Sequence, residues 1–307
     1  MKIPGADPQW CDFPLKAEAW RYSQFLKYLP EELPLAPEKV FTTSELRVEK
    51  SGELDLTTLR QQAASANVGE LTLTVAAGVE LVLRQTIRGA ADGFVHCRLK
   101  LILEEGARVD HALRIQEGSG SMGVIELRSQ LKKNSELKQT YLARGGAGLR
   151  LSLEAELLEA GAHAELSGLC LLAGKEVIDV HSSLVHRAAN TTAQQLAKNL
   201  LDHDSRAVFT GRVHIARGAQ QVAAEQMSRS LMLSPKAQAL SQPQLEIFAD
   251  DVKCAHGSTT GQVGEEASFY LLSRGIPAAR ARELLTRAFV QEVLQKTQSE
   301  SFLAEAL

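Results

Sequence analysis

The sequence has 307 residues and a formal net charge of −3, with 34 Lys and Arg against 37 Asp and Glu. This balance argues against a nucleic-acid binder, which would carry a basic excess to neutralise phosphates, and the 44% of hydrophobic residues argue against dominant disorder. The longest uncharged apolar run, residues 166–174, is much shorter than the about 20 residues of a membrane span.

The N-terminal segment, residues 1–44, is rich in proline and holds a helical candidate at residues 16–28. It begins MKIPGADPQWCDFPLK, without the apolar run of a secretory signal. The cysteines are far apart and form no C-x-x-C pair, which is typical of reduced thiols; they are Cys11, Cys97, Cys170 and Cys254. We therefore expect a cytoplasmic protein.

The central region, residues 45–261, repeatedly alternates apolar and polar residues, as in FVHCRLKLIL at 94–103 and LRLSLEAEL at 149–157. Alternation with period two is typical of half-buried strands. The many Leu and Ala residues favour helix in isolation, but glycine-bearing turns cut the runs to strand length. We therefore predict strands rather than helices.

The same region contains a repeat. Turn-like segments recur at Gly78, Gly106, Asn134, Gly161, Asn190 and Gly218, at separations of 28, 28, 27, 29 and 28 residues. A fixed period of this length is typical of stacked units. Each unit contains two strand candidates and no helix, which predicts a parallel β-helix; an antiparallel sandwich with chance spacing of its turns is the alternative.

A β-helix fills its interior with the inward-facing residues of each turn of the coil. Here the candidates are Leu81, Leu83, Leu99, Leu101, Leu151 and Leu153, or their strand neighbours. The open ends of such a coil expose unpaired backbone. We therefore expect a cap, either a terminal domain or a second protein.

The C-terminal region, residues 262–307, is predicted to be helical. A first helix begins at Glu265, where acidic side chains suit the helix dipole, and ends before Gly275, while Pro277 suits the first turn of a second helix. The second helix carries an apolar stripe of Ala281, Leu284, Leu285, Ala288, Phe289, Val293 and Leu294. Such a stripe packs on the protein's own body, which is the commoner outcome, or docks a partner.

Motifs for common catalytic chemistry are absent from the sequence. It has no G-x-x-x-x-G-K-[ST], G-x-G-x-x-G or G-x-S-x-G. The glycine-rich GSGSMG at 118–123 and the DHDS at 202–205 are both interpreted as turns. Four further histidines are scattered and are expected to be satisfied surface or core residues; they are His163, His181, His186 and His214.

Cys254 and His256 form the one notable pair. In an extended strand, residues i and i+2 point to one face about 6.5 Å apart. A thiolate and an imidazole suit zinc, copper or iron–sulfur chemistry, and the neighbouring Lys253 would help to lower the thiol pKa. Two ligands complete neither a zinc site nor a cluster site. The pair is therefore either structural or completed by a second chain.

Three stretches of the sequence resemble the SufB/SufD family of scaffold subunits for iron–sulfur cluster assembly. They are PQLEIFADDVKCAHGSTTGQVGEEASFYLLSRGIP (243–277), FVQEVL (289–294) and the upstream residues 195–235. The DDVKCxHG form is similar to the SufD type. Ala237 and Gly257 stand where SufB-type chains place a cysteine and a glutamate. AEAWRY at 17–22 resembles the family's N-terminal motif, although the N-terminal domain is much shortened.

The resemblance implies a right-handed parallel β-helix with a C-terminal helical region that docks a SufC-type ATPase. It implies a non-catalytic subunit that pairs with a SufB-type subunit, holds no cofactor stably on its own, and contributes Cys254 and His256 to a transient iron–sulfur cluster shared with that subunit. The residues that it assigns to partner binding are Glu265, Phe269, Tyr270, Leu271, Arg274, Gly275, Phe289 and Val293. Two alternatives stay open: a carbohydrate-active β-helix enzyme and a structural homo-oligomer. An unpaired strand edge also allows a homodimer of the isolated chain.

Overall fold

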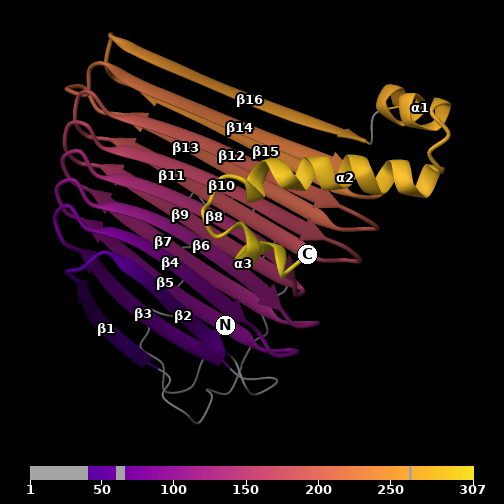
Figure 1. The fold of residues 1–307 in the computed structure, drawn as a ribbon, viewed down its shortest axis with the longest axis horizontal. Coiled ribbons are helices and arrows are strands. Elements are labelled where there is room, and N and C mark those ends of the chain that lie inside the picture. The colour runs from indigo at the N-terminus through magenta and orange to yellow at the C-terminus, as the bar shows by residue number, and fades with distance from the viewer. Residues whose placement is uncertain (1–40, 60–65, 263–264) are drawn as a thin grey trace.

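The computed structural model describes residues 41–59, 66–262 and 265–307. Within these ranges the chain forms a parallel β-helix followed by three helices (Figure 1). The helical candidate at 16–28, the AEAWRY motif and Cys11 lie outside the described residues. The first described strand begins at Phe41, inside the segment assigned above to the N-terminal region.

Sixteen strands of the described ranges alternate between two sheets of eight. The odd-numbered sheet contains β1 (Phe41–Val48), β3 (Ala66–Val75), β5 (Phe94–Leu103), β7 (Met122–Leu131), β9 (Gly148–Leu157), β11 (Val177–His186), β13 (Arg206–Ile215) and β15 (Gln238–Ile247). The even-numbered sheet contains β2 (Gly52–Leu59), β4 (Glu80–Arg88), β6 (Arg108–Glu117), β8 (Glu136–Gly145), β10 (His163–Leu172), β12 (Thr192–Leu201), β14 (Val222–Met232) and β16 (Val252–Gln262). Each strand pairs in parallel with the strand two positions along the chain, as β9 does with β11 and β10 with β12. The predicted β-helix is confirmed, and the antiparallel sandwich is excluded.

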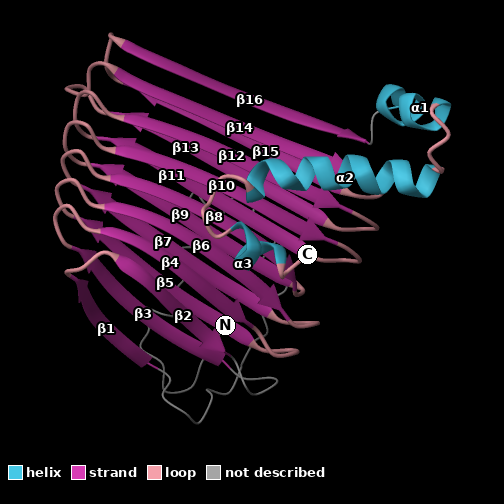
Figure 2. Cartoon of the chain, viewed as in Figure 1, coloured by secondary structure: helices cyan, strands magenta, loops and turns pink. Residues whose placement is uncertain are grey.

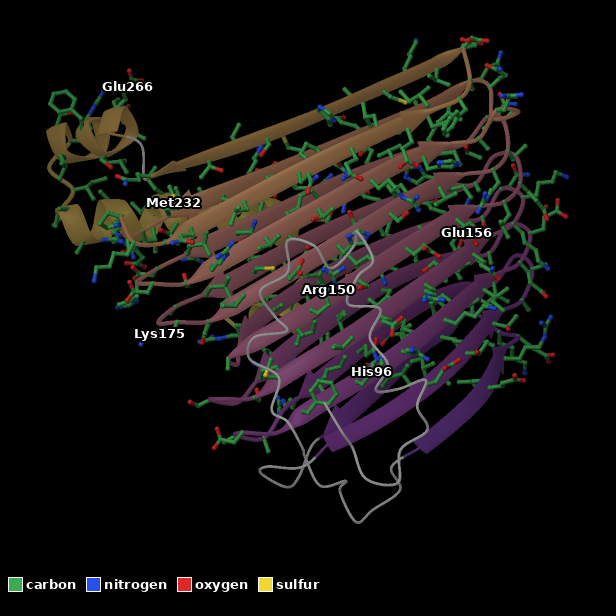
Figure 3. All side chains as sticks on the ribbon, turned by 180° about the vertical axis from the view of Figure 1, so that it is seen from behind. His96, Arg150, Glu156, Lys175, Met232 and Glu266 are labelled. Atoms are coloured by element: carbon green, nitrogen blue, oxygen red, sulfur yellow. The ribbon has the colours of Figure 1, made fainter. Side chains whose placement is uncertain are left out.

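The turns form two columns at opposite ends of the strands, as the positions of Glu156, near the end of β9, and Lys175, in the turn after β10, illustrate (Figure 3). The predicted repeat marks one column. Five of its six turn residues have the left-handed backbone that Gly and Asn adopt most readily; they are Gly78, Gly106, Asn134, Gly161 and Asn190.

The sixth turn residue, Gly218, lies in a turn as predicted but does not have the left-handed backbone. The left-handed residue there is Gln221, with φ 57°. The loop at residues 216–221 is longer than the preceding loops of this column, so the left-handed position moves toward β14. The Gln221 N–H donates to the Asp251 carbonyl at 2.6 Å, and this hydrogen bond joins the turn before β14 to the turn before β16.

The interior is the predicted one. The six candidate leucines are between 0 and 3% exposed and belong to one continuous cluster between the two sheets. At one inner position an aromatic ring packs directly against a glycine of the neighbouring strand. A Cβ on Gly168 of β10 would lie 1.8 Å from the ring of Tyr141 on β8, so only glycine leaves room for this ring.

The helices are α1 (Glu265–Ser273), α2 (Ala278–Leu294) and α3 (Glu300–Ala304). As predicted, α1 ends before Gly275, whose φ is 80°, and Pro277 precedes α2. The end of α2 and α3 pack on the outer face of the even-numbered sheet, while α1 projects beyond the strands (Figure 2). No helix in the described ranges is long and apolar enough to cross a membrane.

Candidate functional site

Cys254 and His256 lie on β16, the terminal strand of the even-numbered sheet (Figure 1). One edge of β16 pairs with β14, which places Cys254 beside Ala224 and His256 beside Gln226. The other edge pairs with no strand of the described ranges. The two candidate ligands therefore lie on the last strand of this sheet, whose outer edge is unpaired among the described strands.

Both side chains point to the inner face, because they are two residues apart on a strand. Cys254 is half-buried and packs against the core, whereas His256 is exposed. Burial raises the pKa of the Cys254 thiol, although a hydrogen bond with the Ala224 backbone acts in the opposite direction. The expectation that Lys253 lowers this pKa was wrong, because Lys253 takes the other face of the strand and burial dominates.

The described residues bring no complete donor set together around Cys254 and His256. Within the described ranges no group of three or more His, Cys, Asp or Glu side chains could hold a metal ion. A tetrahedral site or a cluster needs four ligands. A metal site that used Cys254 and His256 would therefore need ligands beyond those that the described residues bring together.

The predicted partner-binding residues separate into two groups. Those on α1 are largely open to solvent: Phe269 is 72% exposed and Tyr270 is 58% exposed. The Arg274 guanidinium lies 5.3 Å above the Tyr270 ring, and Leu271 is half-buried. Glu265 begins this helix and Gly275 follows its end.

The other group, on α2, contacts the chain's own sheet. Val293 is fully buried in a small cluster with Leu142 and Leu169 of the even-numbered sheet. Phe289 is half-buried, with the Lys198 ammonium 4.3 Å from its ring centroid. This end of the apolar stripe packs on the protein's own body. A partner role for Phe289 and Val293 stays a prediction.

The remaining candidates occupy ordinary structural positions. Residues 118–121 and 202–205 are turns, as expected, whereas Met122 and Gly123 of the predicted 118–123 turn begin β7. The Nδ1 atoms of three histidines have protein partners: Thr192 for His163, Thr191 for His186 and Glu246 for His214. His181 Nδ1 has no hydrogen-bond partner in the described part of the chain, and burial lowers the pKa of His181 to about 4.

Sequence reasoning missed the contacts that hold α2 to the sheet. Lys198 on β12 is nearly buried, donates to the Phe289 carbonyl at 2.8 Å and pairs with the Glu292 carboxylate. Arg229 on β14 contacts the same carboxylate at 3.1 Å. Desolvation lowers the pKa of Lys198 despite this carboxylate.

The last residues are held in the same way. The Asp110 carboxylate accepts from the Thr297 hydroxyl at 2.6 Å and from the Gln298 backbone N–H at 2.8 Å. Arg114 pairs with Glu305 at 2.7 Å. We call residues 289–307, with these partners on the sheet, the C-terminal anchor. Its sequence signal is faint: charged residues at outward positions of successive even-numbered strands.

The fold defines a β-helix solenoid protein with a cysteine and a histidine on the last strand of its even-numbered sheet. Residues 44–289 match the family model described as SUF system FeS cluster assembly, SufBD core domain. The chain therefore belongs to the SufBD core family, which confirms the resemblance seen in its sequence.

Named relatives support this assignment. The chain is 34% identical over 197 residues to an iron–sulfur cluster assembly SufBD family protein of Synechocystis, covering 64% of this chain and 44% of that protein. It is 32% identical over 163 residues to the iron–sulfur cluster assembly protein SufD of Escherichia coli, covering 53% of this chain and 38% of that one. The chain spans less than half the length of either relative. The chain is close to SufD.

Proposed function

We propose that this chain is a non-catalytic scaffold subunit of a cytoplasmic Suf complex. It pairs with a SufB-type subunit at its open end and binds a SufC-type ATPase through α1. The observation that carries the proposal is the position of Cys254 and His256 on an unpaired edge strand. A second solenoid that covered this end would bring the missing ligands to a nascent iron–sulfur cluster, which is the cargo of the reaction.

The surface around the open end supports pairing with a protein. The last strand of the odd-numbered sheet and the residue after it expose large apolar side chains: Leu240 is 42% exposed, Ile247 40% and Phe248 57%. Burying such side chains is the main driving force for association. Together with the free backbone edge of β16, they provide both apolar area and hydrogen-bonding groups.

The helical region supports a separate contact with the ATPase. Phe269 and Tyr270 lie on a helix that projects from the body, and aromatic side chains of this kind dominate many protein interfaces. The C-terminal anchor ties α2 to β12 and β14 through Lys198, Arg229 and Glu292. A movement of α1 and α2 driven by the ATPase would therefore reach the strands beside β16. The ATPase activity itself belongs to the partner.

Co-expression with a SufB-type and a SufC-type subunit tests this proposal. Affinity purification of this chain should recover both partners. The variant Phe269→Glu should lose the ATPase and keep the SufB-type subunit, because it places a charge in the α1 surface alone.

Gln194→Glu is the matched control, since it introduces the same charge at an exposed outward position on β12. It should recover both partners. Failure of the wild-type chain to recover either partner would contradict the proposal.

A further inference from the structure

The outer face of the odd-numbered sheet carries a band of buried side chains near the beginnings of its strands. One row of this band runs in register from β5 to β13. Charged side chains that face outward are almost never fully buried unless they are paired and covered. The members of this row are between 1 and 3% exposed; they are His96, Val124, Arg150, Asp179 and Val208. His96 and Arg150 mark the row in Figure 3.

A second row of the band, two residues earlier on the strands, holds apolar side chains. Phe94, Met122 and Val177 are between 0 and 4% exposed. They belong neither to the core between the two sheets nor to the cluster under α2 and α3, and the same holds for Val124 and Val208. The described helices make their main contacts with β6, β10 and β12 of the other sheet. Neither the core nor these helices therefore account for the burial of the band.

The band also contains a buried ion pair. Arg150 Nη1 donates to Asp179 Oδ2 at 2.6 Å, and both side chains are almost completely buried. An ion pair on a water-facing surface stays hydrated, because removing two charges from water carries a large desolvation penalty. The burial of this pair therefore indicates a covered surface rather than a wet one.

The width of the band indicates what covers it. On β5, β7 and β9 the burial ends after the two rows: Arg98 and Ser152 are half-buried, and Arg128 is exposed. On β11 it continues as far as Val185. Residues two apart on a strand are about 6.6 Å apart, so two rows are about as wide as one extended segment or one helix. A single segment of chain therefore suffices as a cover.

The segment before β1 ends at this band. Phe41, the first residue of β1, lies in register with Val68 of β3, and Val68 lies in register with His96. The row of His96 therefore continues to the point where residues 1–40 join the sheet. From β1 to β13 the sheet spans about 29 Å at about 4.8 Å per strand, which about nine extended residues can cross. Residues 1–40 are long enough to cover the whole band.

The composition of this segment suits an apolar band. Residues 1–40 contain both tryptophans of the chain, Trp10 and Trp20, together with further aromatic side chains. Aromatic side chains bury more apolar area than any others. The loop at residues 60–65, RQQAAS, is short and has no aromatic residue. The N-terminal segment is therefore the better match for the band.

We propose that residues 1–40 dock on the outer face of the odd-numbered sheet, along the band from β5 to β13. Their aromatic side chains cover Phe94, Met122 and Val124 and exclude water from the Arg150–Asp179 pair. The two outer faces of the solenoid are then covered by the segments that precede and follow its strands. The docking concerns this chain alone and is independent of the proposed function.

Methionine oxidation in the full chain tests the proposal, because Met122 lies in the band and the half-buried Met232 lies outside it. Dilute hydrogen peroxide converts accessible methionine to its sulfoxide, and mass spectrometry locates the product. We expect Met122 to react much more slowly than Met232. The double variant Trp10→Ser/Trp20→Ser should accelerate oxidation of Met122 about tenfold, because the segment then leaves the sheet more often.

Gln9→Ser/Glu18→Ser is the matched control, since it replaces two polar residues of the same segment. It should leave the oxidation of Met122 unchanged. Fast oxidation of Met122 in the unaltered chain would overturn the proposal. Slow oxidation that the tryptophan variant leaves unchanged would also overturn it, because another part of the chain or a second copy would then cover the band.

A second pair of variants approaches the contact from the sheet. Val124→Asp places a charge inside the band and should accelerate tryptic cleavage after Arg21 and Lys27 about tenfold, because cleavage follows the population of the undocked segment. Gln130→Asp introduces the same charge on the outer face of the same strand, outside the band, and should leave cleavage unchanged. Equal cleavage of the two variants, with both folded by circular dichroism, would contradict the docking. The tryptophan variants decide the matter if Val124→Asp does not fold.

Discussion

At the residue scale, the fold depends on single positions where two strands approach each other too closely for a second side chain. Gly168 and Tyr141 are the clearest pair, because the ring fills the space of the missing Cβ. Glycine in a strand otherwise weakens it. Its presence here follows from packing between neighbouring rungs rather than from a turn.

We therefore expect Gly168→Ala to lower the free energy of unfolding by about 3 kcal/mol, since the added methyl group must displace a buried aromatic ring. Chemical denaturation measures the change. Gly218→Ala is the control, because a Cβ there meets nothing within 4 Å. Equal stability of the two variants would show that the ring does not occupy this space.

Buried histidines give the protein a predictable response to acid. The pKa of His111 is lowered by burial from 6.5 to about 3. As the pH falls below about 6.5, the unfolded chain takes up a proton that the native chain refuses, so stability decreases. This single residue contributes a slope of about 1.4 kcal/mol per pH unit between these two pKa values.

The variant His111→Gln should make the dependence of unfolding free energy on pH shallower by about that slope between pH 6 and pH 4. Denaturation curves across this range measure it. Gln194→Met, which changes an exposed side chain that does not titrate, should leave the slope unchanged. An unchanged slope in His111→Gln would mean that His111 is already protonated in the native state.

At the scale of elements, the strands and turns could be predicted because their determinants are local. The alternation of apolar and polar residues predicted that Leu81 and Leu151 point into the core. Asn134 and Gly161 marked turns, because few other residues readily adopt a left-handed backbone. The C-terminal anchor could not be predicted. Asp110 and Thr297, for example, meet across 187 positions of sequence, and nothing local to either residue indicates the other.

The candidate site divides in the same way. The spacing of Cys254 and His256 was legible from the sequence, but their relation to Ala224 and Gln226 required the strand register. The effect of Lys253 was misjudged because adjacency in sequence means opposite faces in a strand. The surface on which the apolar stripe of α2 packs also could not be predicted, because the sequence pattern is the same whether the stripe packs on the chain's own sheet or on a partner.

The C-terminal anchor should depend on Glu292. Replacing it in Glu292→Gln leaves the nearly buried Lys198 ammonium without its carboxylate, at a cost of about 1–2 kcal/mol after allowance for the 43% exposure of the carboxylate. Hydrogen exchange of residues 289–307 should accelerate.

Glu283→Gln breaks the exposed Arg280–Glu283 pair in the first half of the same helix and serves as the control. It should cost at most about 0.5 kcal/mol and leave exchange in residues 289–307 unchanged. Equal effects of the two changes would contradict a special role for the buried lysine.

At the scale of the whole molecule, the chain is a coil of stacked strands with an unfinished end. Among the described residues, the end strand has an unpaired backbone edge and apolar neighbours, and it carries Cys254 and His256, which we propose as two ligands of a metal centre. The anchored helices connect this end to the projecting α1. We propose one shared explanation for these features, a subunit that other proteins complete.

Hydrogen exchange of the chain alone and in complex with a SufB-type subunit tests this explanation most directly. We predict strong protection of the amides of β16 (Val252–Gln262) on complex formation, with little change in central strands such as β8 and β9. A stable complex in which β16 exchanges as fast as in the isolated chain would place the partner elsewhere and contradict the account.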